Sequence, residues 1–129
     1  MTHPNEALLR KGYEAYERGD GETVESVMAD EIEWHMPGTG PLAGDYIGKD
    51  QVLGFFAKKM ELSSGTFTQA EHDVLANDSH IVGLTKFTGE RPGKSLSVNA
   101  IQLWQMRDGK LADCVELFED QEAWDEFWS

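Results

Sequence analysis

The residue pattern changes its period near residue 65, and this change constrains the fold more than any other feature of the chain. Beyond it, four segments with strand-like composition cover residues 66–76, 80–90, 95–106 and 110–119. They are separated by "NDS", "RPGK" and "RDG", which are short runs of turn-forming residues. Strands joined by turns this short pair in antiparallel fashion. The C-terminal half is therefore predicted to form an antiparallel sheet.

The N-terminal half shows helical spacing instead. Within residues 5–19, Leu9, Tyr13 and Tyr16 recur at i, i+4 and i+7, which predicts an amphipathic helix. Gly19 follows this pattern and can end the helix. The expected helix therefore turns one aromatic face toward the interior.

The remaining elements are short. Asp20 can cap a second helix, and "IEWHM" (residues 32–36) predicts a strand that the loop "GTGPLAG" follows. Helical spacing returns over residues 50–61, with Asp50 as the expected cap, and residues 120–128 predict a final short helix that Asp120 caps.

This order of elements predicts an α+β fold. Three N-terminal helices precede an antiparallel sheet, and helices segregated from such a sheet define the class. A length of 129 residues fits one domain, covering residues 1–129. A highly curved sheet wrapped over the helices would form a cone with an apolar interior, which is the usual place for a small-ligand site.

Composition narrows the possible partners. The chain has 11 Lys and Arg against 24 Asp and Glu, for a net charge of −13. This balance argues against binding to nucleic acid or to an anionic membrane surface. Cys114 is the only cysteine, which excludes an internal disulfide, and the N-terminal residues contain no long apolar run, so we expect a cytoplasmic protein.

No cofactor or metal site is expected. The sequence contains neither a phosphate-binding loop nor a dinucleotide fingerprint. No two histidines stand at close ligand spacing, which argues against a metal.

The last two predicted strands bring polar side chains to faces that are otherwise apolar. Alternate residues of a strand share a face, so Gln102 and Glu116 are both expected to point into the cone. A buried carboxylate has a raised pKa, which suits it to proton transfer. The two inward sets are Val98, Ala100, Gln102 and Trp104, and Ala112, Cys114, Glu116 and Phe118.

His35 is the third candidate catalytic residue. It stands in "EWHMPGTGPLAGDYIG", directly before a Gly- and Pro-containing loop that could shape a pocket mouth. A histidine titrates near neutral pH, and one that faced Glu116 would complete an acid/base pair. The alternative is that His35 holds the loop in place. The expected substrate-binding wall comprises Tyr16, Trp34, Phe55, Phe56, His72, Trp104 and Phe118.

The whole chain resembles the SnoaL-like polyketide cyclases and ketosteroid isomerase-like proteins of the nuclear transport factor 2-like superfamily. The most telling segments are "EWHMPGTGPLAGDYIGKDQVLGFF" and "RDGKLADCVELFEDQEAWDEFW". The resemblance implies the curved-sheet fold. The superfamily includes isomerases, cyclases, dehydratases and non-catalytic binders, so the fold alone does not select a function.

The resemblance also implies site residues. His35 aligns with the Asp base of the ketosteroid isomerases, Gln102 falls near their oxyanion-holding Asp, and Gly12 replaces their oxyanion Tyr. Because all three positions differ, steroid isomerase activity does not transfer. Glu116 aligns with the catalytic Asp of the SnoaL-like cyclases, seven residues after Gly109.

Two kinds of function remain open. One is cofactor-independent acid/base chemistry on a hydrophobic oxygenated substrate, as an isomerase, aldol-type cyclase or dehydratase. The other is a non-catalytic protein that binds a hydrophobic ligand or dimerises. A homodimer is expected in either case, because Ile101, Leu103, Val115 and Leu117 would form an apolar patch on the outer face of the sheet.

Overall fold

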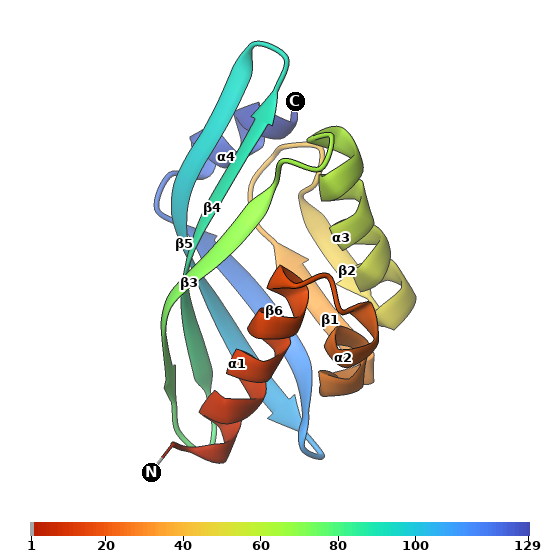
Figure 1. Cartoon of the computed structure of the whole chain (residues 1–129), viewed down its shortest axis with the longest axis vertical. Coiled ribbons are helices and arrows are strands. Elements are labelled where there is room, and N and C mark those ends of the chain that lie inside the picture. Colours follow the sequence, from red (N-terminus) through yellow and green to blue (C-terminus); the bar gives the residue numbers. More distant parts are fainter. Residues whose placement is uncertain (1) are drawn as a thin grey trace.

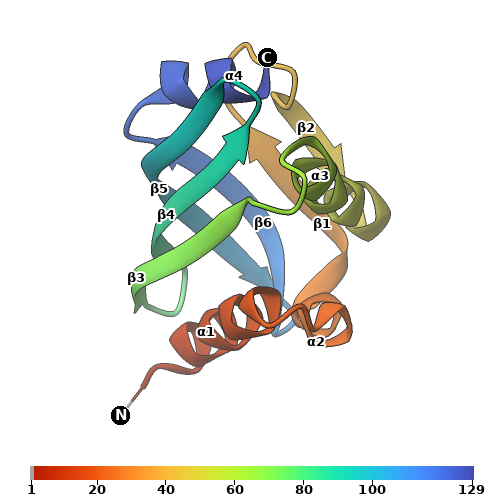
Figure 2. The ribbon, with the colours of Figure 1, turned by 45° about the horizontal axis from the view of Figure 1, so that its top comes forward.

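The computed structural model describes residues 2–129, which fold into a curved sheet and four helices (Figures 1 and 2). Along the chain the elements are α1 (Pro4–Glu17), α2 (Gly21–Val27), β1 (Met28–Met36), β2 (Gly44–Ile47), α3 (Lys49–Leu62), β3 (Thr68–Ala76), β4 (Ile81–Arg91), β5 (Lys94–Arg107), β6 (Lys110–Phe118) and α4 (Gln121–Trp128). The predicted α+β class is confirmed.

The sheet is mixed rather than purely antiparallel. Its strand order is β2-β1-β6-β5-β4-β3, and β1 runs parallel to β6 while every other neighbouring pair is antiparallel. The parallel pair joins strands far apart in the sequence, so no hairpin turn forces them to oppose each other. The sequence-based expectation of an antiparallel sheet was wrong for this pair, and it missed β2 after the predicted loop.

Two of the three predicted helix caps are present. The side chain of Asp20 accepts a hydrogen bond from the backbone N–H of Thr23, and that of Asp120 accepts one from Ala123. The third was wrong, because α3 begins one residue earlier than expected, at Lys49, with Gly48 as its cap. Asp50 instead lies in the first turn, where its charge favours the helix dipole.

The helices cover the inner face of the sheet. α1 packs against β3, α3 lies along β1, and α4 packs against β5 and β6 at one end of the molecule (Figure 2). The buried core runs between these layers and includes Trp124 and Trp128 of α4. Among residues 2–129, no helix is both long and apolar enough to cross a membrane. Because the helices cover the concave side of the sheet, an enclosed ligand site is expected on that side.

Candidate functional site

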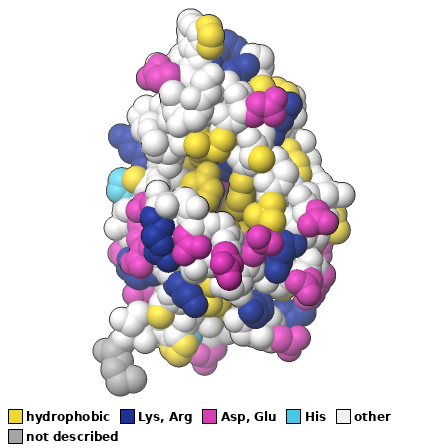
Figure 3. Space-filling view, turned by 45° about the vertical axis from the view of Figure 1, so that its right-hand side comes forward, with side chains coloured by type: hydrophobic (Ala, Val, Ile, Leu, Met, Phe, Trp, Pro, Cys, Tyr) yellow, Lys and Arg dark blue, Asp and Glu magenta, His cyan; other side chains and the backbone are white. Residues whose placement is uncertain are grey.

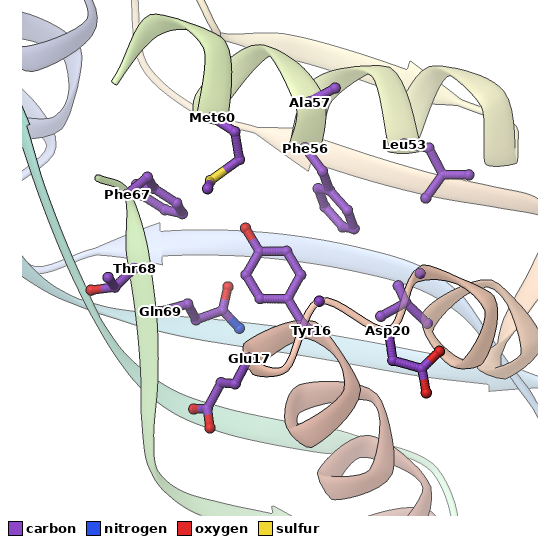
Figure 4. Close-up of a pocket in the computed structure, with 13 residues that line it drawn as sticks. Tyr16, Glu17, Asp20, Leu53, Phe56, Ala57, Met60, Phe67, Thr68 and Gln69 are labelled. Carbon is purple, nitrogen blue, oxygen red and sulfur yellow. The ribbon is translucent and has the colours of Figure 1, made fainter. Parts of the chain in front are cut away.

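A cleft of about 640 Å³ opens between the helices and β3. It is bounded by the end of α1, the start of α2, one face of α3 and the start of β3 (Figure 4). Tyr16 projects from α1 toward the α3 side, opposite Phe56 and Met60 (Figure 4). Apolar side chains gather in a hollow on one face of the molecule, with charged side chains around them (Figure 3). Such a lining suits a hydrophobic ligand.

A second, much smaller chamber lies deeper. Its volume is about 30 Å³, close to that of one water molecule. Tyr16, Val24, Phe56 and Gln69 line both spaces, and the rings of Tyr16 and Phe56 meet edge to face at 5.6 Å. The chamber is also lined by Tyr13, Trp34, Gln102 and Trp104. The Tyr16–Phe56 pair therefore forms a shared wall between the cleft and an inner chamber that the polar side chain of Gln102 also lines.

Glu116 is the most enclosed acid of the site. Its side chain is wholly buried, and Oε1 accepts a hydrogen bond of 2.8 Å from the indole N–H of Trp34. Within residues 2–129, Oε2 accepts no hydrogen bond at all. Burial raises the pKa of Glu116, while the charge of Lys59, the Trp34 N–H and the nearby amide of Gln102 act in the opposite direction. One carboxylate oxygen is thus anchored and the other is free to exchange a proton.

Lys59 of α3 is the cationic partner, and sequence analysis missed it. Its side chain is 1% exposed, and Nζ lies 4.4, 5.1 and 4.7 Å from the ring centroids of Phe55, Phe56 and Phe67. Burial lowers the pKa of Lys59 to about 8, although the negative charge of Glu116 raises it in part. The sequence could have indicated this burial, because Val52, Phe55 and Lys59 fall on one face of a helix.

Gln102 supports the site from β5. Its Oε1 accepts a hydrogen bond of 2.6 Å from the hydroxyl of Tyr13, so its amide N–H groups are the donors that remain. Both side chains are buried, and Gln102 lies directly opposite Glu116 in the β5–β6 register. The prediction that Gln102 and Glu116 share the inner face is confirmed by their burial.

Tyr16 contributes a hydroxyl without a partner. Its oxygen is buried and makes no hydrogen bond within residues 2–129. Burial, together with the charge of Glu116, raises the pKa of Tyr16 to about 12, so the group is a hydrogen-bond donor at neutral pH. A buried hydroxyl and a buried carboxylate oxygen, both unpaired, are what a polar ligand group could satisfy.

His35 does not point into this site. Its Nδ1 lies 2.8 Å from Asp45 of β2 and its Nε2 lies 3.1 Å from Asp113 of β6, on the outer face of the sheet. The inward position belongs to its neighbour Trp34, because Ile32, Trp34 and Met36 alternate on the buried face of β1. The prediction that His35 faces the cavity was wrong. Its side chain does not hold the following loop either, but links β1 to an aspartate on each neighbouring strand.

These contacts predict a pH-dependent role in stability. The two aspartates raise the pKa of His35, with Asp45 contributing most, so its stabilising effect is fully present below the unfolded pKa of about 6.5. It is lost as the pH rises through the higher folded value. We expect His35→Gln to lower the free energy of unfolding at pH 6 by up to about 1 kcal/mol, as for partly exposed ion pairs, and by less at pH 9.

Urea titrations at both pH values would measure this change. His80→Gln, at an exposed position before β4, is the matched control and should show no such pH-dependent difference. An equal loss at pH 6 and pH 9 for His35→Gln would contradict the ion-pair explanation.

Three expected wall residues lie outside the cleft and its chamber. His72 is exposed, because a β-bulge between Glu71 and Asp73 breaks the alternation of β3, so that its expected inward orientation was wrong. Phe118 stacks on Trp124 at 4.3 Å and belongs to the core near α4. Phe55 stacks on Tyr46 at 4.5 Å, on the side of α3 away from the cleft. The remaining four lie where expected: Tyr16, Trp34, Phe56 and Trp104.

Comparison with known proteins agrees with this geometry. A family model described as a SnoaL-like domain matches residues 9–114. The chain belongs to the SnoaL-like family. The fold of this chain is similar to that of a nuclear transport factor 2-like protein from Burkholderia xenovorans LB400, with a TM-score of 0.82 and 21% identity over 100% of this chain and 98% of the other. The SnoaL-like family expected from the sequence is thus confirmed by the family model.

Two relatives are more similar in sequence to this SnoaL-like chain. Bal32a, from a soil-derived mobile gene cassette, has a TM-score of 0.94 and 33% identity, and the match covers 98% of this chain and 97% of Bal32a. An uncharacterized protein of Mycobacterium tuberculosis is 28% identical over 123 residues, which cover 95% of this chain and 94% of the relative. The similarity therefore extends over nearly the full length of each protein.

Proposed function

We propose that this SnoaL-like protein is a small-molecule enzyme that moves protons without a cofactor on a hydrophobic, oxygenated substrate. The observation that carries the proposal is the wholly buried Glu116, with Oε1 held by Trp34 and Oε2 unpaired. Isomerisation, aldol-type cyclisation and dehydration all require a proton to leave or join a carbon beside a carbonyl. A carboxylate with a raised pKa is suited to that transfer.

The proposed roles follow from the partners of each group. Glu116 Oε2 removes the proton, and the negative charge that develops on the substrate carbonyl oxygen receives a hydrogen bond from the Tyr16 hydroxyl. The amide N–H groups of Gln102 are the second donor, since Tyr13 occupies its Oε1. The substrate's apolar body would lie in the cleft, and its carbonyl would pass the Tyr16–Phe56 wall.

Filling the cleft tests the proposal without touching the acid/base groups. Ala57 lines the cleft from α3, and Ala57→Trp is expected to lower substrate-dependent proton exchange at least 10-fold by occupying the binding space. The assay follows deuterium uptake from D₂O into a panel of hydrophobic aryl ketones and β-diketones by mass spectrometry. Glu61→Trp, on the same helix at an exposed position outside the cleft, is the matched control. Absence of exchange above background for every ketone would argue against an enzyme of this class.

A non-catalytic ligand-binding protein is the second candidate. It is favoured by one observation, that Glu116 does not itself line the open cleft, whose surface is largely apolar. In that case the panel would bind, as measured by quenching of Trp fluorescence, and no deuterium would be incorporated. Both candidates therefore predict that the ketones bind, but only the enzyme predicts that deuterium is incorporated into them.

We further propose that the outer face of the sheet forms a homodimer. Ile101 stands opposite Leu117, and Leu103 opposite Val115, in the β5–β6 register. Ile101 and Leu117 are 40% and 49% exposed, which leaves an apolar patch that a second copy would cover. Light scattering is expected to give twice the 14.5 kDa chain mass. Leu117→Glu should yield the monomer, whereas Met60→Glu, at an exposed position on α3, should not. A wild-type particle of 14.5 kDa at micromolar concentration would contradict the dimer.

A further inference from the structure

We infer that Lys59 is a nucleophilic amine that captures the carbonyl group of a hydrophobic aldehyde or ketone as a Schiff base. The inference rests on the proposed function, because it places a carbonyl substrate in the same cleft. It assigns a covalent step to a residue that proton transfer by Glu116 does not require.

The surroundings of Lys59 set it apart from the other lysines. Nζ is enclosed by the rings of Phe55, Phe56 and Phe67, at 4.4 to 5.1 Å from their centroids. It makes no direct ion pair with a carboxylate within residues 2–129. A buried lysine held only by aromatic faces keeps its lone pair available once it loses its proton.

Burial makes the neutral amine accessible near physiological pH. With the pKa of Lys59 lowered to about 8, about half of the side chain is neutral at pH 8. An exposed lysine with a pKa of about 10.4 is neutral in only about 0.4% of molecules at that pH. Lys59 thus has roughly a hundredfold larger fraction of the nucleophilic form. Desolvated lysines are used in this way in covalent catalysis.

The cleft provides the route for the carbonyl compound. Phe56, Met60 and Phe67 line the cleft, and the rings of Phe56 and Phe67 also contact the ammonium group of Lys59. The Phe56 and Phe67 rings thus contact both the cleft and Nζ, and they separate a ligand seated in the cleft from Lys59. Phe56 is the less buried of the two rings, so its movement is the route that would bring a carbonyl carbon to Nζ.

The chemical step balances with groups already in the site. The Nζ lone pair attacks the carbonyl carbon, the C=O π electrons move to oxygen, and a proton passes from nitrogen to that oxygen to give a carbinolamine. The hydroxyl then leaves as water with a proton from the carboxyl of Glu116, whose pKa is raised by burial. The products are a protonated imine and water. Such an imine makes the neighbouring C–H more acidic, so the ionised Glu116 could then remove that proton.

Reductive trapping on the intact wild-type protein tests the inference. The protein is incubated at pH 7.5 with biphenyl-4-carbaldehyde and sodium cyanoborohydride, which reduces an imine to a stable secondary amine. Labelled lysines are then mapped by peptide mass spectrometry. We expect Lys59 to be labelled at least 10-fold faster than Lys58, its exposed neighbour on α3 and the matched control. The labelling rate at Lys59 should rise with a midpoint near pH 8.

Variants separate the possible outcomes. Lys59→Arg should abolish the fast labelling and Lys58→Arg should leave it unchanged, with circular dichroism confirming that both are folded. Labelling of Lys59 no faster than that of Lys58 in the wild-type protein would overturn the inference, whether or not Lys59→Arg folds. If Glu116-dependent deuterium exchange persisted in that case, the proposed function would stand without the covalent step. Fast labelling of Lys59 without any deuterium exchange would mean that Lys59 is nucleophilic and that the proposed proton-transfer function is wrong.

Discussion

Glu116→Gln is expected to lower the rate of deuterium exchange into a ketone substrate by about 10²–10⁴-fold, the usual cost of removing a general acid or base. Gln has nearly the same shape as Glu, and its carbonyl oxygen can still accept the hydrogen bond from Trp34 Nε1. The substitution therefore removes the titrating group while keeping the packing. Exchange kinetics in D₂O, measured at saturating ketone, would give the loss directly.

Glu119→Gln is the control for this experiment. It removes the same charge from an exposed position just after β6, so it should leave the exchange rate within about twofold of the wild type. Ligand binding should survive in both variants, because the cleft itself is unchanged. A Glu116→Gln protein that exchanges protons at the wild-type rate would remove Glu116 from the mechanism.

Gly83→Ala is expected to lower the free energy of unfolding strongly, although it adds only one methyl group. Gly83 of β4 stands opposite Gln102, and a Cβ at this position would overlap the hydroxyl oxygen of Tyr13 and lie 2.9 Å from its Cζ. The Tyr13 ring would have to move and break its bond to Gln102. Overpacking costs about 1–3 kcal/mol, and a buried unpaired group costs a similar amount, so we expect about 3 kcal/mol in all.

Thermal unfolding would show this loss as a decrease in Tm of about 10 °C for a chain of this size. Gly54→Ala is the matched control, because a Cβ there meets nothing within 4 Å and an exposed helix position gains from Ala. In the Tyr13→Phe background, Gly83→Ala should cost less, since the overlapping oxygen is gone. Equal costs in the two backgrounds would show that Tyr13 is not what Gly83 accommodates.

The sequence predicted the sheet and one wall of the site because strand alternation is strict where pairing is regular. The inward positions of Gln102 and Glu116 follow from apolar neighbours two residues away on each side. The same rule, applied to "IEWHM", would have placed Trp34 inward and His35 outward. The alignment of His35 with a catalytic position in related proteins was a weaker guide than the alternation of its own strand.

Other features could not be predicted from local pattern. The β-bulge at His72 has no residue type that would distinguish it from a regular strand. It reverses which face of the sheet each residue before it in β3 points to. The parallel pairing of β1 with β6 depends on contacts between the two ends of the chain. Lys59 has the spacing of a core residue, but its charge argued against burial, and only the aromatic rings around it explain how burial is tolerated.

The parallel pairing of β1 with β6 also determines when the site can form during synthesis. The hydrogen bond from Trp34 to Glu116 joins residues 82 positions apart, and β6 is synthesised after the other five strands of the sheet. Until it does, Trp34 has no carboxylate to hold and β1 lacks a neighbour on one edge. Contacts of such long range slow folding, because the loop must close before they stabilise it. The nascent chain therefore carries α1 to α3 and the strands β1 to β5 before it carries β6, and the pairing of Trp34 with Glu116 forms only once β6 is present.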